Sequence, residues 1–256
     1  MNRRNFLAAS GGALLSACPI CLGAARADEK GGGHRWAYHG SEGPEHWGKL
    51  SPDFKSCEIG MQQSPIALGK GVRADVGPIG IDYKPMPLRI VNNGHTIQAN
   101  CEPGNGCLID GVRYDLKQFH FHHPSEHLLE GRAFDLEIHF VNVASDGRLA
   151  VLGVMVQPNS DNPALTPILD AMPAEAGKEI ALGAPFAPAT LLPTRRGYFR
   201  YYGSLTTPPC SETVLWSVFG HPILASMDQI RKFAALFPGN ARPAQPLNRR
   251  MVLFGG

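Results

Sequence analysis

The stretch Gln118-Phe119-His120-Phe121-His122-His123-Pro124-Ser125-Glu126-His127 places four histidines and a glutamate within ten residues. Side chains alternate between the two faces of a β-strand. A strand over residues 118–122 therefore puts His120 and His122 on one face together with Gln118, while the two phenylalanines point to the other face. Two imidazoles that can bind a metal converge on one side of this strand, and an apolar layer lies on the other.

A second strand is predicted for the run Phe134-Asp135-Leu136-Glu137-Ile138-His139-Phe140-Val141. Its alternation places Glu137 and His139 on one face and apolar side chains on the other. If this strand lies antiparallel to the first, it supplies a third imidazole. Three histidines around one metal with a fourth position left open are typical of a catalytic zinc site.

The composition indicates an ordinary globular protein. The chain has 256 residues, of which 43% are hydrophobic and 18% charged, and it contains 29 glycines and 22 prolines. Short runs of β-branched and aromatic residues lie between the glycines and prolines, which favours a β-rich single domain with many turns. No domain boundary is evident between Trp36 and the C-terminus.

Further elements follow from local patterns. Residues 87–99 read as two strands joined or bent at Asn93-Gly94, a strong turn dipeptide, and His95 beside this turn is either an exposed bystander or a proton carrier. The continuous apolar run 149–156 predicts a strand buried on both faces. A further strand is predicted for 198–202, and short helices for 162–172 and 228–237.

The N-terminal residues 1–27 are predicted to be an export signal. Arg3-Arg4 precede an apolar, glycine-rich segment that ends in Ala25-Arg26-Ala27, as in a twin-arginine-like signal peptide. Cleavage after Ala27 leaves a catalytic domain of residues 28–256 in the periplasm or outside the cell, with no stable membrane insertion. As a minor alternative, processing at Cys18 would leave a lipid-anchored protein.

The charge balance argues against nucleic acid as a partner. The full chain has 24 basic and 22 acidic residues, a net charge of +2; removal of Arg3, Arg4 and Arg26 leaves 21 basic against 22 acidic residues, a net charge of −1. No basic tract with interleaved aromatic residues is present in the sequence. Whether the chain forms a homodimer is left open.

Four cysteines remain outside the predicted signal. Cys57, Cys101, Cys107 and Cys210 form an even set in an exported chain, which fits two disulfides. Four cysteines allow three pairings, and the residues themselves do not select one.

Several motifs together resemble, in order and spacing, the α-class carbonic anhydrases, and they are closer to the bacterial, exported type than to the animal one. The motifs are 118–122, 125–127, 137–139 and Gly203-Ser204-Leu205-Thr206-Thr207-Pro208-Pro209, supported by 43–47, 63–66, 92–95 and 240–246. They extend over nearly all of residues 28–256. The resemblance implies a large central, mostly antiparallel twisted β-sheet with short peripheral helices.

The resemblance implies a role for each residue of the site. His120, His122 and His139 would bind zinc (Zn²⁺), with water or hydroxide as the fourth ligand. Behind them, Gln118, Glu137 and the backbone carbonyl of Asn240 would accept hydrogen bonds from the ligating rings and fix their tautomers. Thr206 would accept from the zinc hydroxide and donate to Glu126, and Thr207 would contact the product bicarbonate.

Other residues would serve the substrate, the proton and the fold. His95 would carry the proton, with Tyr38 and Asn93 ordering the water between it and the metal. Cys57 and Cys210 match a disulfide common in bacterial members, which leaves Cys101 to pair with Cys107. The residues that match the apolar pocket for carbon dioxide are Val141, Val151, Leu205, Val214 and Trp216.

The function implied by the resemblance is the reversible hydration of carbon dioxide to bicarbonate and a proton. Zinc-bound hydroxide would be the nucleophile, and the hydrolysis of esters would be a side activity. One rival is a binding module of the same fold without zinc, but all three histidines, Thr206 and Glu126 are present. Another is a set of metal-free histidines on a sheet, which would bury unpartnered polar rings at about 1–3 kcal/mol each.

Overall fold

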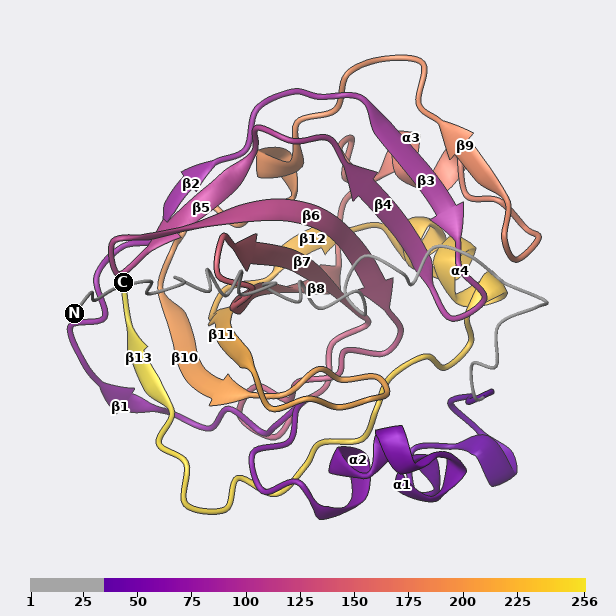
Figure 1. Ribbon diagram of the computed structural model, residues 1–256. Coiled ribbons are helices and arrows are strands. Elements are labelled where there is room, and N and C mark those ends of the chain that lie inside the picture. Colours follow the sequence, from indigo (N-terminus) through magenta and orange to yellow (C-terminus); the bar gives the residue numbers. More distant parts are fainter. Residues whose placement is uncertain (1–34) are drawn as a thin grey trace, which may run out of the picture.

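A computed structural model describes residues 35–256 of the chain, so the predicted export signal and its cleavage site lie outside the described residues. The described chain is built around one sheet of 13 strands with short helices at its periphery (Figure 1). The strands are β1 Val72–Arg73, β2 Gly80–Asp82, β3 Leu88–Asn92, β4 Ile97–Cys101, β5 Gly106–Ile109, β6 Val112–His122, β7 Leu136–Ala144, β8 Leu149–Pro158, β9 Glu179–Ala181, β10 Tyr198–Gly203, β11 Val214–Phe219, β12 Ile223–Ala225 and β13 Leu253–Gly255. The helices and 3₁₀ turns are η2 Gly40–Glu42, α1 Trp47–Leu50, η3 Pro52–Phe54, α2 Ser56–Ile59, α3 Thr166–Asp170, η4 Pro188–Leu191 and α4 Met227–Leu236.

The strand order is β1-β13-β10-β11-β8-β7-β6-β4-β3-β9, with β12 beside β8, and β2 joined through β5 to β6. Most neighbours are antiparallel; β8 is parallel to both β11 and β12, and β1 is parallel to β13. The prediction of a large, mostly antiparallel sheet is therefore confirmed. The long strands β6, β7 and β8 occupy its centre.

The two faces of the central strands bury different sets of side chains. One face carries the larger apolar core, in which Phe119, Phe121 and Phe140 pack with α3 and α4 residues such as Phe233. The opposite face carries a smaller cluster around Trp216, together with the histidines. The phenylalanine layer predicted behind the histidines is thus part of the main core.

Both predicted helices are present, and their bounds show what limits them. α4 begins after Ser226, whose hydroxyl accepts from the Gln229 amide while the Gln229 side chain accepts from the Ser226 amide, a capping box. α3 is shorter than the predicted 162–172. The first residues of the predicted range form a turn before α3, in which the Asn162 side chain accepts from the Ala164 amide. Such local hydrogen bonds compete with those of a helix.

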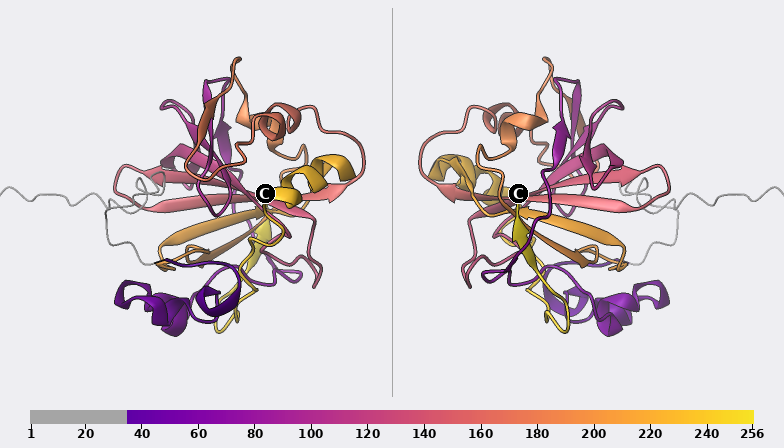
Figure 2. Two further views of the ribbon diagram at one scale, coloured as in Figure 1. Left: turned by 90° about the vertical axis from the view of Figure 1, so that its right-hand side faces the viewer. Right: turned by 90° about the vertical axis from the view of Figure 1, so that its left-hand side faces the viewer.

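The aromatic-rich segment at the start of the described chain forms short helices. α1 and α2 lie together as a separate layer beside the sheet (Figure 2). Trp47 of α1 is fully buried, and its indole nitrogen donates to the carbonyl oxygens of Ala37 and Glu42. Within residues 35–256, the helices are all too short or too polar to cross a bilayer.

The four cysteines within residues 35–256 form one disulfide and leave two free thiols. Cys57 of α2 is bonded to Cys210, which follows the segment bearing Thr206, as the resemblance implied. The predicted pairing of Cys101 with Cys107 is wrong, since both are free. Each lies in its own strand pairing, Cys101 opposite Leu88 and Cys107 opposite Tyr114. Burial raises the pKa of Cys107 to about 12, which disfavours the thiolate that disulfide formation requires.

Candidate metal centre

Three histidines meet on one face of the strands β6 and β7. His120 and His139 are cross-strand partners, and His122 lies two residues along β6 on the same face. One nitrogen from each ring lies within 4.8 Å of the other two. His122 and His139 are each only 1% exposed. The alternation read from the sequence therefore predicted this convergence correctly.

Each of these rings is held from behind by one acceptor. His120 Nδ1 donates to Gln118 Oε1 at 2.8 Å, and His139 Nε2 donates to Glu137 Oε1 at 2.8 Å. His122 Nδ1 donates to the backbone carbonyl of Asn240 at 2.7 Å. Because a carbonyl or carboxylate oxygen can only accept, these bonds leave Nε2 of His120 and His122 and Nδ1 of His139 unprotonated when the rings are neutral.

The surroundings keep the three rings neutral. Burial lowers the pKa of His122 to about 4 and that of His120 well below its ordinary value, and it also lowers the pKa of His139. Repulsion between neighbouring rings acts in the same direction for His120, whereas Glu137 opposes the shift. Neutral imidazoles are the form that binds a metal ion.

Two buried atoms at the cluster have no hydrogen-bond partner among the described residues, namely Nε2 of His122 and Oε2 of Glu126. They lie 3.5 Å apart, and Nδ1 of His139 lies 3.8 Å from the same oxygen. Leaving a buried polar atom unpaired costs about 1–3 kcal/mol. Three converging nitrogens with an unpaired lone pair fit a divalent metal, and zinc accepts this donor set with one position open.

A second group of possible ligands, made of His127, Glu137 and His139, is closed by its own hydrogen bonds. His127 Nδ1 contacts Glu137 Oε1 at 2.7 Å, and His127 Nε2 contacts the Tyr201 hydroxyl at 2.6 Å. The other carboxylate oxygen of Glu137 accepts from the amides of Glu126 and His127. This group is a structural network that supports the first, and His127 has a structural role in it.

Glu126 is buried beside the histidines and is held by the segment that follows Asn240. Its Oε1 accepts from the Arg242 amide at 2.9 Å. Burial raises the pKa of Glu126 to about 7, while His139, the Arg242 amide and the Thr206 side chain act in the opposite direction. The sequence did not reveal the part of Arg242, because a backbone amide leaves no residue-type pattern.

A cleft of about 140 Å³ opens beside His120 and His139. Its remaining lining comes from Gln118, Val141, Leu149, Val151, Leu205, Thr206, Thr207, Pro208, Pro209 and Trp216. Four of the five predicted apolar residues therefore line it. Val214 is fully buried in the cluster behind it instead. Leu149 was missed, although it precedes Val151 by two residues on β8 and so shares its face.

His95 lies in the turn between β3 and β4, with its ring stacked on Trp36 at a centroid distance of 3.7 Å. Asn93 shapes this turn, since its Oδ1 accepts from the amides of His95 and Thr96. Burial lowers the pKa of His95. Tyr38 is close to both regions: its ring centroid lies 6.5 Å from that of His95, and burial followed by the charge of Glu126 raises its pKa.

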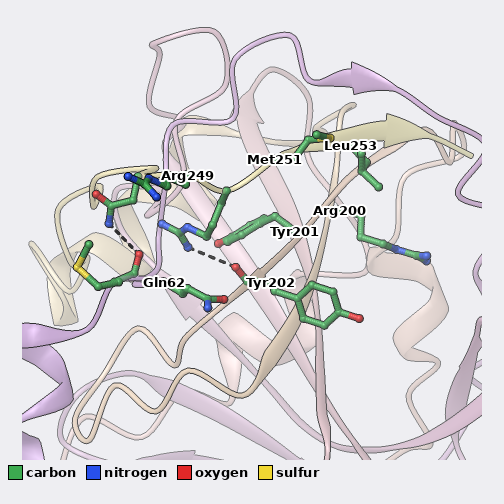
Figure 3. A pocket seen from close by; sticks show the side chains of 10 residues that line it. Gln62, Arg200, Tyr201, Tyr202, Arg249, Met251 and Leu253 are labelled. Carbon is green, nitrogen blue, oxygen red and sulfur yellow. Dashed lines mark hydrogen bonds between the residues drawn. The ribbon is translucent and has the colours of Figure 1, made fainter.

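A larger hollow of about 770 Å³ lies elsewhere, where the chain around residues 248–251 passes β10 (Figure 3). The exposed side chains of Met61, Tyr202 and Met251 line it. Arg250 in its wall donates to the carbonyl oxygens of Leu247, Pro246 and Tyr202. The described lining includes no histidine or carboxylate, so the reactive groups gather in the smaller cleft.

Comparison with known proteins agrees with this geometry. Residues 42–255 match the family model described as eukaryotic-type carbonic anhydrase. The chain belongs to this family.

Carbonic anhydrases of bacteria are similar over most of their length. A carbonic anhydrase from Nostoc sp. is 46% identical to this chain, and the matched region covers 85% of each of the two chains. One from Pectobacterium carotovorum is 43% identical over 91% of this chain and 95% of its own. The solved α-carbonic anhydrase of Thermovibrio ammonificans, in complex with sulfanilamide, is 45% identical, covers 87% of this chain and 100% of its own, and superposes with a TM-score of 0.85. The family and these relatives indicate carbonic anhydrase activity, the hydration of carbon dioxide.

Proposed function

We propose that this carbonic anhydrase works with zinc bound by His120, His122 and His139. The observation that carries the proposal is the buried, unpaired Nε2 of His122 together with two further ring nitrogens within 4.8 Å. When bound, zinc supplies a Lewis acid that lowers the pKa of a water molecule to about 7. Gln118, Glu137 and the Asn240 carbonyl fix the three rings, so little reorganisation is needed for binding.

Thr206 and Glu126 orient the reacting water. An ionised Glu126 can only accept, so a Thr206 hydroxyl that donates to it must itself accept from the water. This directs a lone pair of the water oxygen into the cleft. Burial alone would keep Glu126 protonated, and the Arg242 amide at Oε1 favours the carboxylate. A divalent cation held by the neighbouring histidines would favour it further.

The cleft holds the substrate and releases the product. Val141, Val151, Leu205 and Trp216, joined by Leu149, offer carbon dioxide an apolar wall close to His120 and His139. Thr207 at the same cleft would donate to bicarbonate, which is charged and therefore less suited to an apolar wall than to water. Val214 supports this wall from behind. Esters that fit the cleft would be hydrolysed as a side activity.

His95 would remove the proton released in each cycle. Its lowered pKa makes it a weak base that gives the proton up readily. Asn93 positions its backbone, and Tyr38, which burial keeps neutral, can order water by hydrogen bonding.

We further propose export of residues 28–256 after cleavage of residues 1–27. The disulfide between Cys57 and Cys210 supports an oxidising compartment.

Stopped-flow measurement of carbon dioxide hydration, combined with metal analysis, tests the proposal. We expect one zinc per chain, loss of hydration after chelation and recovery when zinc is added back. Thr206→Ala should lower kcat/KM about 100-fold while retaining zinc, and Thr206→Ser should recover most of this loss because it keeps the hydroxyl. Full hydration by the metal-free chain would refute the zinc site, and loss of zinc in Thr206→Ala would refute the orienting role.

A further inference from the structure

A second imidazole, that of His39, shares a hollow with His95 at the side of the active site. The hollow has a volume of about 220 Å³. Both histidines line it, together with Trp36, Tyr38 and residues 236–240. Nothing in the mechanism proposed above uses His39.

His39 is held in a defined position although it is exposed. Its Nε2 lies 2.8 Å from the carbonyl oxygen of Gly239. Since a carbonyl can only accept, Nε2 donates and the lone pair of Nδ1 remains available to take up a proton. The ring also packs on Gly239: a Cβ at this glycine would lie 3.0 Å from Cε1 and Nε2 of His39. The absence of a side chain there makes room for the imidazole.

The same short segment anchors His95. Asn240, which follows Gly239, donates from Nδ2 to the carbonyl oxygen of His95 at 3.0 Å. The His95 ring is stacked on Trp36 with an interplanar angle of 6°. The two imidazoles are therefore both tied to residues 239–240, one through its ring and the other through its backbone.

The hollow between them suits water and carries little charge of its own. A water molecule takes about 30 Å³ of liquid volume, so the space accommodates several. Polar partners for them are available on the side chains of Tyr38, His39 and His95 in its lining. The titratable groups in its described lining are Tyr38, His39 and His95. Tyr38 stays neutral at physiological pH because burial raises its pKa, so the two histidines are the groups that can exchange protons.

We propose that His39 is a second proton carrier, which takes the proton from His95 through water in this hollow and delivers it to buffer. Each transfer moves one proton: His95 returns to its neutral form, His39 becomes the cation, and a buffer base then removes the proton. The inference rests on the proposed shuttle role of His95. It adds a group at the surface, where buffer meets the chain more easily than at the stacked His95 ring.

The test measures hydration by the zinc-loaded enzyme in weak and strong buffer for His39→Gln, His95→Ala and the double variant. We expect His39→Gln to lower kcat about threefold in weak buffer with kcat/KM unchanged, because buffer can still reach His95 directly. Concentrated imidazole buffer should restore kcat. The matched control is His46→Gln, since His46 is a partly exposed histidine of the same segment that lies near Glu45 and does not line the hollow; the kcat of this variant should not change.

The double variant separates a series relay from other roles. If His39 receives its proton from His95, the double variant should be no slower than His95→Ala alone. An unchanged kcat in His39→Gln, or a loss that persists in concentrated imidazole buffer, would overturn the role of His39. If His95→Ala itself leaves kcat in weak buffer unchanged, the shuttle of the proposed function fails, and the relay built on it fails with it.

Discussion

Two groups of buried histidines share the strands β6 and β7 and even share the residue His139, yet they differ in what their nitrogens contact. In the closed group, both nitrogens of His127 have partners, Glu137 and Tyr201. The open group consists of His120, His122 and His139. Each ring donates one hydrogen bond to an acceptor away from the cluster, its other nitrogen lies near the other two rings, and Nε2 of His122 has no hydrogen-bond partner. The hydrogen bonds of the closed group use both nitrogens of His127, whereas the open group keeps an unpaired nitrogen that the proposed zinc would bind.

This difference explains why a count of nearby ligands is a poor guide to a metal site. Both groups meet a simple distance criterion. Only the open one leaves lone pairs free after the hydrogen bonds are assigned, and a metal ion requires free lone pairs. The closed group then acts as a support, since Glu137 holds His127 and His139 at once.

The largest expected effect comes from breaking the open group. His122→Ala should reduce zinc to well below one per chain and lower hydration by roughly 1,000-fold or more. Metal analysis after gel filtration and stopped-flow hydration measure both quantities. The matched control is His123→Ala, because His123 is adjacent in sequence but donates from Nδ1 to the Asp135 carbonyl, outside the cluster. Equal zinc loss in both variants would contradict the assignment.

Acid should destabilise the metal-free chain through the open group. The folded pKa of His122, about 4, is below the unfolded value of about 6.5, so the unfolded state binds more protons between these values. The contribution of His122 to the free energy of unfolding is therefore fully present above pH 6.5. It decreases as the pH falls toward 4, by roughly 3 kcal/mol. Glu126 has the opposite effect, because its pKa of about 7 in the folded state stabilises the fold as the pH falls below 7. Its gain in the free energy of unfolding is about equal to the loss from His122. The pKa values of His120 and His139 are also lowered, so the chain as a whole loses stability as the pH falls.

Urea unfolding of the metal-free chain at pH 7 and pH 5 measures this loss. Saturating zinc should reduce the difference, since the bound metal keeps the rings unprotonated. Stability that is equal at the two pH values, or higher at pH 5, would show that the rings are not held neutral in the fold.

Breaking the closed group should produce the smallest effect and a different one. His127→Ala should lower the free energy of unfolding by about 2 kcal/mol, because Glu137 and Tyr201 each lose one buried hydrogen bond but keep another partner. Zinc should remain at one per chain. Tyr201→Phe, which removes a single hydroxyl of the same network, should cost about 1 kcal/mol. Zinc loss in His127→Ala as severe as in His122→Ala would erase the distinction between the groups.

The sequence predicted the centre of the fold well because alternation is a local property. The run from Gln118 to His122 and the run ending at Val141 each have a period of two, and the structure pairs them antiparallel with His120 opposite His139. α4 was also predicted closely, over 228–237, since its apolar residues recur at helical spacing and Pro238-Gly239 follow as a stop. Such patterns depend only on neighbouring residues.

Features that depend on distant parts of the chain were less accessible. The even number of cysteines suggested a second disulfide, but strand pairing keeps the half-buried Cys101 and the buried Cys107 as separate free thiols. The sequence also gave no sign that the Arg242 amide holds Glu126, or that His39 packs on a glycine 200 residues away. These contacts involve backbone groups, which every residue type possesses.

The acceptor behind His122 also bears on how the enzyme can be altered by evolution or by protein engineering. Substitution of Gln118 or Glu137 changes the hydrogen-bond partner of His120 or His139 directly, so the electron density on those two rings can be adjusted one residue at a time. His122 donates instead to the backbone carbonyl of residue 240, and no point substitution removes a peptide carbonyl. Two of the three proposed ligands are thus adjustable by side-chain exchange, while the third can be altered only by moving the main chain at position 240.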